Sequence, residues 1–252
     1  MAKFIRSALV VLIIFLMVGL TSDPTKIAGV KVQAAPTAAE RNRAVYDLKD
    51  MAYIKWKTSS SLYIWYHTYT PNIVYKGMPY TQTYNTTYSD FLSRGNLDYK
   101  TNTLTYNGNA KVGNDCSTVP ALAWKFKFPS IGYASIYTGS YLSCAKTGAN
   151  STYHLVNVGT YTIDSDSTLE YTSKPTVDLT KYYNQLKKGD CCLKYTSGTK
   201  HVIFVEAVGS GCVYITDQIG WSDGDDFSTW RHYHKMTWAE LKREGYVPMG
   251  FS

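Results

Sequence analysis

The sequence predicts an α+β fold, with a single domain that follows an N-terminal extension. Residues 38–57 repeat apolar side chains with a period close to 3.6, which is typical of an amphipathic helix. The second half instead holds short apolar runs, several of them alternating and separated by glycine-containing turns, which favour strands. No internal repeat or long low-complexity linker divides the chain, so we expect residues 38–252 to form one domain.

The first half has few strong periods beyond the N-terminal helix. Residues 59–112 are rich in Tyr, Thr and Asn, and we expect loops and a short helix there. A second helix is predicted over 117–126, with Pro120 in its first turn, where proline is tolerated. This helix directly follows a polar cluster, GNDCST, at residues 113–118.

Strands dominate the prediction for the second half. The runs 201–208 and 212–221 predict a hairpin, because a Gly-Ser-Gly turn joins two apolar segments. The other predicted strands are 153–163, 191–196 and 246–251, and the predicted helices are 180–190 and 237–245.

The first 34 residues have the features of a secretory signal peptide. Lys3 and Arg6 precede a thirteen-residue, almost wholly apolar run (8–20), and a small-residue exit follows, with cleavage expected before Ala35. An uncleaved membrane anchor is the alternative, but this run is shorter than the roughly 20 residues that span a bilayer. We therefore expect residues 1–34 to be removed and the mature chain to be secreted, without stable membrane insertion. The small positive charge of the mature chain is compatible with attraction to an anionic surface such as a cell wall.

The net charge argues against a nucleic-acid partner, and the cysteine spacing argues against a bound metal. Residues 1–34 hold four of the 26 bases and one of the 19 acids, so the mature chain keeps 22 bases and 18 acids, a net charge of +4. This excess is small and contains no Lys/Arg run, so we expect no nucleic-acid partner. Cys191 and Cys192 are adjacent and no His lies at ligand spacing, so we expect no metal site and no cofactor.

Cys116 is the cysteine whose position suits a nucleophile. It lies beside Asp115 where the predicted helix 117–126 begins, and unpaired N–H groups at a helix start stabilise a thiolate. A buried structural cysteine can occupy the same position, so the assignment depends on partners. The odd total of five cysteines leaves at least one thiol free in an exported chain, and with Cys116 free the other four allow three pairings.

His201 is the histidine best placed to serve as the base. Among the five histidines it alone opens an apolar strand directly after a turn, although a surface histidine at an edge strand gives the same pattern. Folding the hairpin about Ser210 puts residue 201 opposite about 217–219. Asp217 would then orient the imidazole as the third member of a triad, and Gln218 takes that place if the register slips by one residue.

Taken in order along the chain, these motifs resemble those of the NlpC-type papain-like cell-wall peptidases and the related CHAP amidases. The Asp-Cys-Ser that opens an apolar helix is matched at 115–117, and the Gly-Asp before the strand that precedes the histidine is matched at 189–190. The family's Gly-x-Pro-Tyr element is matched by GMPY at 77–80. The strand 213–221 is similar to the one that ends Glu-Gln-Asn-Trp in CHAP domains, which gives Asp217 the triad position.

The chain also departs from the family pattern. Thr118 stands where Gly usually follows Asp-Cys-Ser, and Ile219 stands where Asn is usual. The second Gly-rich part of the tyrosine motif is missing, and some thirty residues separate GMPY from Cys116. These differences bear on the substrate more than on the fold.

The resemblance implies a papain-like fold, in which a helix that carries Cys116 packs on an antiparallel sheet that carries His201. It also implies a secreted cysteine amidohydrolase or endopeptidase that acts on peptidoglycan peptides. Tyr80, Asp115 and Ser117 are the residues expected to contact the substrate or the oxyanion, together with the Cys116 backbone N–H. Two of these have structural alternatives, since Asp115 suits a helix N-cap and Tyr80 suits a packed aromatic.

Two other classes of function stay open at this stage. A non-catalytic module could bind wall fragments on a tyrosine-rich surface, but the Cys-His pair argues against it. An acyltransferase would use the same Cys116 and His201. Hydrolysis and transfer differ only in whether water or an amine reaches the acyl-enzyme.

Overall fold

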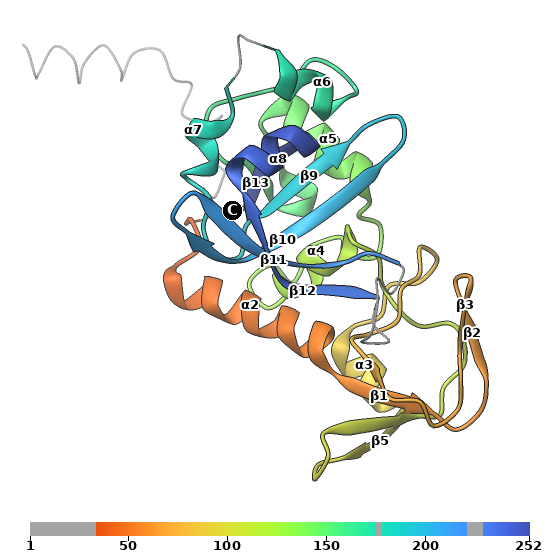
Figure 1. Ribbon diagram of the computed structural model, residues 1–252. Coiled ribbons are helices and arrows are strands. Elements are labelled where there is room, and N and C mark those ends of the chain that lie inside the picture. Colours follow the sequence, from red (N-terminus) through yellow and green to blue (C-terminus); the bar gives the residue numbers. More distant parts are fainter. Residues whose placement is uncertain (1–33, 175–177, 221–228) are drawn as a thin grey trace, which may run out of the picture. The chain divides into compact units, whose positions relative to one another are not determined.

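The computed structural model describes residues 34–174, 178–220 and 229–252. The predicted signal peptide therefore lies outside the described residues except for Ala34, as does the last residue of the predicted strand 212–221. Residues 35–252 form one compact unit of helices and sheets, which confirms the α+β class (Figure 1). Within the described ranges, no helix combines the length and apolar character needed to cross a membrane.

The N-terminal helix α2 (Ala38–Tyr53) begins with a capping box. The Thr37 hydroxyl accepts from the Glu40 N–H at 3.2 Å, and the Glu40 carboxylate accepts from the Thr37 N–H at 2.7 Å. The helix ends four residues before its predicted end, because from Ile54 onward alternate side chains are buried and the chain continues as strand β1 (Lys55–Thr58). Its buried face matches the predicted period: Ala44, Val45, Leu48, Met51 and Ala52.

The Tyr-rich segment 59–112 contributes three strands to a four-stranded sheet that the sequence did not predict, and β1 is the fourth strand. Its order is β4-β1-β6-β5, with β1 and β6 parallel and the other neighbours antiparallel. Each strand has only two to four residues, too few for an alternating pattern to be recognised. The short helix predicted in this segment is present as α3 (Tyr88–Ser93). The remaining strands are β4 (Tyr75–Lys76), β5 (Gly95–Asp98) and β6 (Thr103–Tyr106).

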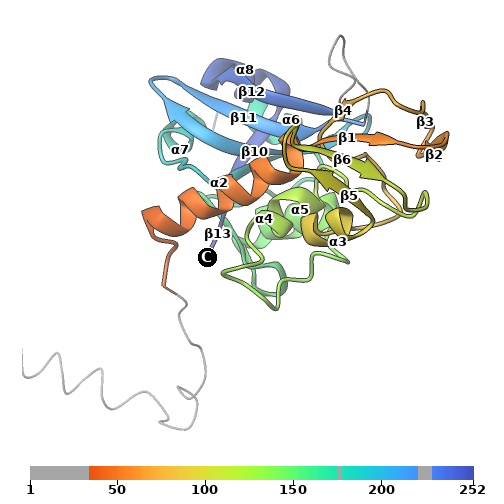
Figure 2. The ribbon, with the colours of Figure 1, turned by 90° about the horizontal axis from the view of Figure 1, so that it is seen from below.

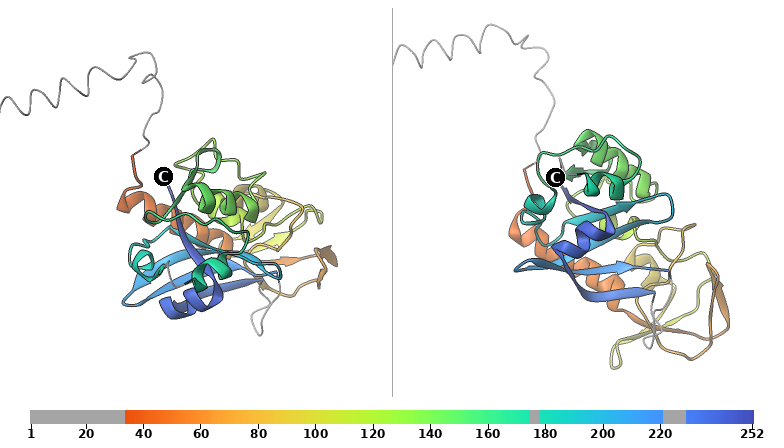
Figure 3. Two further views of the ribbon diagram at one scale, coloured as in Figure 1. Left: turned by 90° about the horizontal axis from the view of Figure 1, so that it is seen from above. Right: turned by 45° about the horizontal axis from the view of Figure 1, so that its top comes forward.

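An aromatic cluster around Trp56 forms the core at this sheet. Trp56 is fully buried, and its indole N–H donates to the Gly77 carbonyl at 2.8 Å. A hairpin of β2 (Leu62–Ile64) and β3 (His67–Tyr69) belongs to the same region, and Figures 1 and 3 show the chain from β1 to β6 at one end of the domain. Four rings lie with centroids 4.8 to 5.9 Å from that of Trp56: Tyr69, Tyr75, Phe91 and Tyr106.

A seven-stranded sheet forms the framework of the other part, and all its neighbouring strands are antiparallel. The strand predicted over 153–163 is reduced to three residues, because the chain turns at Gly159 (φ +102°). Strand β12 was not predicted. In sheet order the strands are β12 (Trp230–Thr237), β11 (Cys212–Gln218), β10 (Lys200–Gly209), β9 (Cys191–Tyr195), β13 (Tyr246–Phe251), β8 (Leu155–Asn157) and β7 (Ala149–Asn150).

Helices cover both faces of this sheet. In Figure 2, α2, α4 (Thr118–Ala123) and α5 (Thr138–Thr147) lie on one side of β10–β12, and α8 (Trp238–Glu244) lies on the other. The predicted helices 117–126 and 180–190 are shorter than expected, at six residues for α4 and four for α7 (Thr180–Tyr183). The remaining helices, η1 (Ser151–Tyr153) and α6 (Thr168–Ser173), were not predicted, and neither was α5.

Candidate active site

The β10–β11 hairpin determines which residue faces His201. The two strands pair antiparallel, with a bulge at Glu206. Because side chains alternate along a strand, Asp217 and Gln218 must face opposite ways. His201 Nε2 hydrogen-bonds Asp217 Oδ2, whereas Gln218 Nε2 donates to the carbonyl of Met78 at 2.9 Å. The structure therefore brings Asp217, and not Gln218, to the histidine.

Cys116 completes a continuous chain of contacts with these two residues. It lies in the turn directly before α4, and its thiol lies against the imidazole of His201, close enough to raise the pKa of that ring. Since Nε2 faces Asp217, Nδ1 is the ring nitrogen left for the sulfur. Both partners are largely enclosed, with Cys116 7% exposed and the His201 side chain 14% exposed. The predicted residues Cys116, His201 and Asp217 thus lie together.

Two negatively charged groups outweigh the effect of burial on the pKa of His201. Burial lowers the pKa of the imidazole, but the charge of Cys116, followed by the charge of Asp217 and hydrogen bonds to both, raises that pKa to about 10. The imidazolium form of His201 is therefore favoured at neutral pH. Because α4 has only six residues and a correspondingly small dipole, the helix start contributes little to the electrostatics at Cys116.

Arg231 joins the cluster from β12, and the sequence did not identify it. Its Nε donates to Asp217 Oδ1 at 3.0 Å and its Nη2 to Oδ2 at 2.7 Å, which makes a bidentate pair. The two residues are direct register partners on β11 and β12. The segment WRHYHKMT (230–237) lacks clear apolar alternation, so the strand was missed. Recognising it would have placed an arginine beside Asp217.

Asp217 is a buried carboxylate shared between two cations. Its side chain is 1% exposed. Burial favours the neutral acid, but the charge of His201 and then the hydrogen bond and charge of Arg231 outweigh it and hold the pKa of Asp217 below its usual value. Asp217 therefore stays ionised at neutral pH, where it can accept from the imidazole but cannot supply a proton.

Asp115 and Ser117 build the turn that presents Cys116. Asp115 Oδ1 accepts from the N–H groups of Ser117 (3.0 Å) and Thr118 (2.8 Å) and from both of their hydroxyls (2.8 and 2.9 Å). This is the capping role that was the structural alternative for Asp115. Ser117 is fully buried and its hydroxyl donates to Asp115.

Tyr80 lies beside Cys116 because its backbone pairs with the residue two positions before that cysteine. Tyr80 and Asn114 form a parallel bridge. Gln82 Nε2 donates to the phenol oxygen at 2.8 Å, which leaves the proton of the phenol for another acceptor. Burial, together with the nearby charges of Cys116 and Asp115, raises the pKa of Tyr80 to about 12. Tyr80 is therefore a neutral hydrogen-bond donor at the site.

The GMPY segment is fixed to the edge of the seven-stranded sheet through one carbonyl. Gly77 has φ +78°, and a Cβ on it would lie 2.3 Å from the indole of Trp230, so only glycine fits. Three side chains donate to the carbonyl of Met78: Gln218 Nε2 at 2.9 Å, Trp230 Nε1 at 2.8 Å and Thr229 Oγ1 at 3.3 Å. Gln218 therefore positions the segment that carries Tyr80 and takes no part in the triad.

All five cysteines are free and buried, so none of the possible disulfide pairings is present. Burial raises the pKa of Cys144 to about 12 and raises those of Cys191 and Cys192 well above the usual range. A buried thiol without a nearby cation is a poor nucleophile. Cys116 differs from these three thiols because His201 contacts it.

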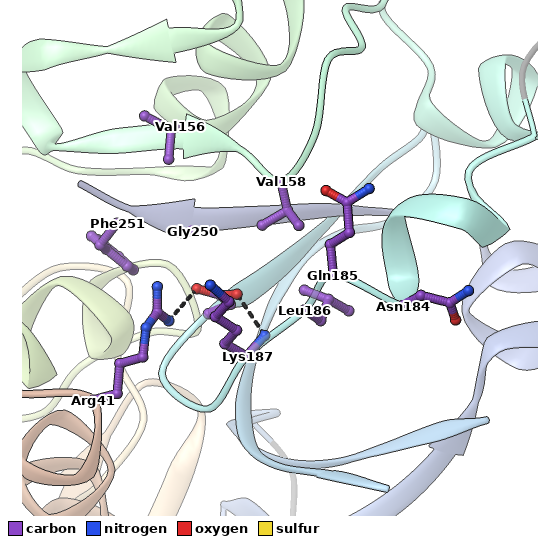
Figure 4. A pocket seen from close by; sticks show the side chains of 10 residues that line it. Arg41, Val156, Val158, Asn184, Gln185, Leu186, Lys187, Gly250 and Phe251 are labelled. Carbon is purple, nitrogen blue, oxygen red and sulfur yellow. Dashed lines mark hydrogen bonds and ion pairs between the residues drawn. The ribbon is translucent and has the colours of Figure 1, made fainter. Parts of the chain in front are cut away.

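A separate cavity of about 460 Å³ lies beside α2, the residues after α7 and the end of β13 (Figure 4). Arg41 Nη1 donates to Asp190 Oδ1 at 2.7 Å, and the Lys187 N–H donates to Oδ2 at 2.7 Å. The buried carboxylate in the wall is thus already paired, and Cys116 is not among the lining residues. The Gly189–Asp190 motif has a structural role here, because it ties the start of β9 to α2.

In the part of the chain that the structure describes, no group of three or more His, Cys, Asp or Glu side chains is arranged to hold a metal ion. Comparisons with protein-family models, with curated proteins and with solved structures found no match to this chain. Conclusions about function therefore depend on the geometry around Cys116.

Proposed function

We propose that this chain is an exported cysteine hydrolase of papain-like architecture, which cleaves amide bonds in peptidoglycan peptides. The observation that carries the proposal is the continuous contact from Cys116 through His201 to Asp217. One nitrogen of the imidazole is left for a thiol and the other faces a buried carboxylate, which is the arrangement that nucleophilic catalysis needs. The order of the motifs along the chain supports the substrate class.

The reaction begins when the Cys116 thiolate attacks the amide carbonyl and a C–S bond forms. Two donors suit the resulting oxyanion: the Cys116 N–H, which has no acceptor among the described residues, and the neutral phenol of Tyr80. The His201 imidazolium then gives its proton to the leaving amine as the C–N bond breaks. Water, deprotonated by His201, finally hydrolyses the thioester and restores the thiolate.

Asp217 and Arg231 act through the histidine. Asp217 accepts from Nε2 and so keeps Nδ1 toward the sulfur. The bidentate contact with Arg231 fixes the carboxylate and keeps it ionised. Arg231 is therefore a positioning residue, two contacts removed from the reacting atoms.

A binding module without turnover fits this geometry less well. Enclosing a thiolate, an imidazolium and a carboxylate has an unfavourable desolvation free energy. A module that only binds its ligand would gain nothing from this arrangement. An acyltransferase fits the same residues, and it differs in the acceptor of the acyl group alone.

A digest of purified peptidoglycan with residues 35–252, followed by mass spectrometry, tests the proposal. We expect new peptide amines and carboxylates with the wild-type protein and none with Cys116→Ala. Added glycine as an amine acceptor separates the two reactions, since a transferase would yield the glycine adduct. Equal digestion by the wild-type and Cys116→Ala proteins would rule out the proposed cysteine hydrolase.

A further inference from the structure

The β2–β3 hairpin turns through two aromatic residues in an unusual backbone conformation. Trp65 and Tyr66 have φ of 42° and 64°, and Ile64 and His67 pair on either side of them. A two-residue turn of this kind favours Asn-Gly, because small residues reach positive φ easily. Bulky side chains are outliers there, and such strain is concentrated at sites where the structure uses it. The turn therefore presents two rings at a cost in local stability.

The two rings continue into the candidate active site as an aromatic row of Tyr66, Trp65 and Tyr80. Tyr66 packs edge-on against Trp65 with centroids 5.3 Å apart, and Trp65 packs edge-on against Tyr80 at 6.5 Å. Tyr80 lies close enough to Cys116 for the thiolate charge to affect its pKa. Tyr66, at the outer end, is 67% exposed. The aromatic row therefore leads from solvent to the proposed nucleophile.

Lys76 is the only Asp, Glu, Lys or Arg in the sequence from residue 58 to residue 89, and its ammonium group lies 4.9 Å from the ring centroid of Tyr53. Residues 58–75 and 77–89 contain no Asp, Glu, Lys or Arg, although these types make up 18% of the whole chain. Burial lowers the pKa of His67, so this histidine is neutral as well. The polar residues in both segments are hydroxyl and amide side chains. These two segments offer a charged ligand no ion-pair partner, whereas their side chains match an uncharged ligand with ring faces and hydroxyl groups.

We propose that the aromatic row binds sugar rings of a glycan strand, so that the peptide is cleaved while it is still attached to its glycan. This inference rests on the proposed function and specifies its substrate. The pyranose ring of an N-acetylhexosamine has an apolar C–H face that packs on an aromatic ring, and its hydroxyl and acetamido groups hydrogen-bond at the edge. With a sugar on Trp65 and Tyr66, the attached peptide extends past Tyr80 to Cys116.

Binding without turnover is the first test. The Cys116→Ala protein is titrated with a soluble oligomer of N-acetylglucosamine in a calorimeter. We expect measurable binding that weakens at least tenfold when Trp65→Ala or Tyr66→Gly is added. Tyr99→Ala is the matched control, because Tyr99 is 87% exposed but lies outside the aromatic row, and it should leave the affinity unchanged. Absence of binding, or an equal loss in the control, overturns the inference.

Thermal stability separates a binding role from a structural one. Glycine adopts φ of 64° without strain, so Tyr66→Gly should keep or raise the melting temperature while it weakens oligosaccharide binding. Opposite changes in the two quantities support the inference. If Tyr66→Gly lowers the melting temperature and leaves the affinity intact, Tyr66 serves the fold and the inference fails.

Turnover on two substrates with the same peptide completes the test. In Trp65→Ala and Tyr66→Gly we expect kcat/KM to fall at least tenfold more on glycan-linked peptide than on the free peptide. Equal losses on both substrates would contradict a glycan site. If the wild-type protein cleaves neither substrate, the proposed function fails, while the calorimetric titration still decides whether the aromatic row binds sugar.

Discussion

The two main sheets of the domain differ in what they bury. The seven-stranded sheet region buries three carboxylates, Asp190, Glu206 and Asp217, each 2% exposed. Around the four-stranded sheet, the buried side chains among the described residues are aromatic and aliphatic groups with a few threonine hydroxyls. A buried charge needs a partner in a defined geometry, whereas rings pack in many arrangements. Chemistry that depends on exact placement is therefore expected in the first region, and recognition by shape in the second.

Two of the three carboxylates hold the fold together. Asp190 pairs with Arg41 at 2.7 Å and Glu206 pairs with Lys49 at 2.7 Å, and both cations belong to α2. These pairs tie the N-terminal helix to the sheet, and neither cation reaches a nucleophile. Removal of one partner would leave a buried charge and destabilise the domain.

The third carboxylate differs in what its cations do. Asp217 contacts Arg231 and His201, and His201 in turn contacts the Cys116 thiol. Asp190 and Glu206 each pair with one cation. Asp217 instead also contacts His201, whose imidazole can exchange a proton. This difference separates the candidate catalytic carboxylate from the two structural ones.

Loss of the proposed nucleophile, Cys116, should have the largest effect. Cys116→Ala should lower peptidoglycan hydrolysis by roughly 10⁴-fold or more, because no acyl-enzyme can form. The melting temperature should change little in comparison. Cys212→Ala is the matched control and should retain activity. In mass-spectrometric mapping, iodoacetamide should label Cys116 before Cys144, whose pKa burial raises to about 12. Near-wild-type turnover in Cys116→Ala would contradict the site.

Asp217→Asn should reduce turnover by roughly one to three orders of magnitude. In a serine triad the equivalent change costs about four orders. A thiolate–imidazolium pair depends less on its orienting carboxylate, since the thiol is already more acidic than a hydroxyl. Gln218→Ala is the neighbouring control on the opposite face of β11, and we expect a change of a few-fold at most. Wild-type rates in both variants would leave His201 acting without a third residue.

Arg231→Gln should lower kcat about tenfold with little change in KM, as expected for a residue that acts through Asp217. Arg231 helps to lower the pKa of Asp217, so its removal should raise that pKa. The carboxylate then becomes protonated at a higher pH, and the acid limb of the kcat profile should move to higher pH. Arg231→Lys keeps the charge and should restore part of this shift. An unchanged acid limb would reduce Arg231 to a structural role.

The hairpin explains why much of the candidate site could be predicted from sequence. Continuous apolar runs and a glycine turn fix the β10–β11 pairing, and the pairing fixes which residue faces His201. Even so, the prediction left one residue of uncertainty between Asp217 and Gln218. Only the side-chain contacts, with Gln218 on Met78 and Asp217 on His201, remove it.

Two features could not be predicted because they depend on contacts between distant segments. Strand β12 has no apolar alternation, and its pairing with β11 is visible only in three dimensions, so Arg231 was missed. The Tyr-rich segment forms its sheet from strands of two to four residues around Trp56. Its pattern is set by ring packing, which leaves no period of 2 or 3.6 in the sequence.

A further expected effect is on the pH dependence of stability. The pKa of His201 is raised from 6.5 to about 10 in the folded protein. A raised pKa contributes stability that is fully present below pH 6.5 and is lost as the pH rises toward 10. The difference in melting temperature between the wild type and His201→Gln should therefore shrink steadily over this window. Each tenfold change in proton affinity corresponds to about 1.4 kcal/mol of folding free energy. For a domain of this size, each kcal/mol shifts the melting temperature by ~2–4 °C.

The same titration in a Cys116→Ala background identifies the source of the shift. The charge of Cys116 is the largest of the influences that raise the pKa of His201, and Asp217 is the next. Without the thiolate the pKa of His201 should fall, so the stability linked to His201 should be lost at a lower pH than in the wild type. Melting temperatures at half-unit steps from pH 6.5 to 10 measure this. An identical window in both backgrounds would mean that Asp217 alone holds the proton on His201, and that no ion pair with Cys116 exists before substrate binds.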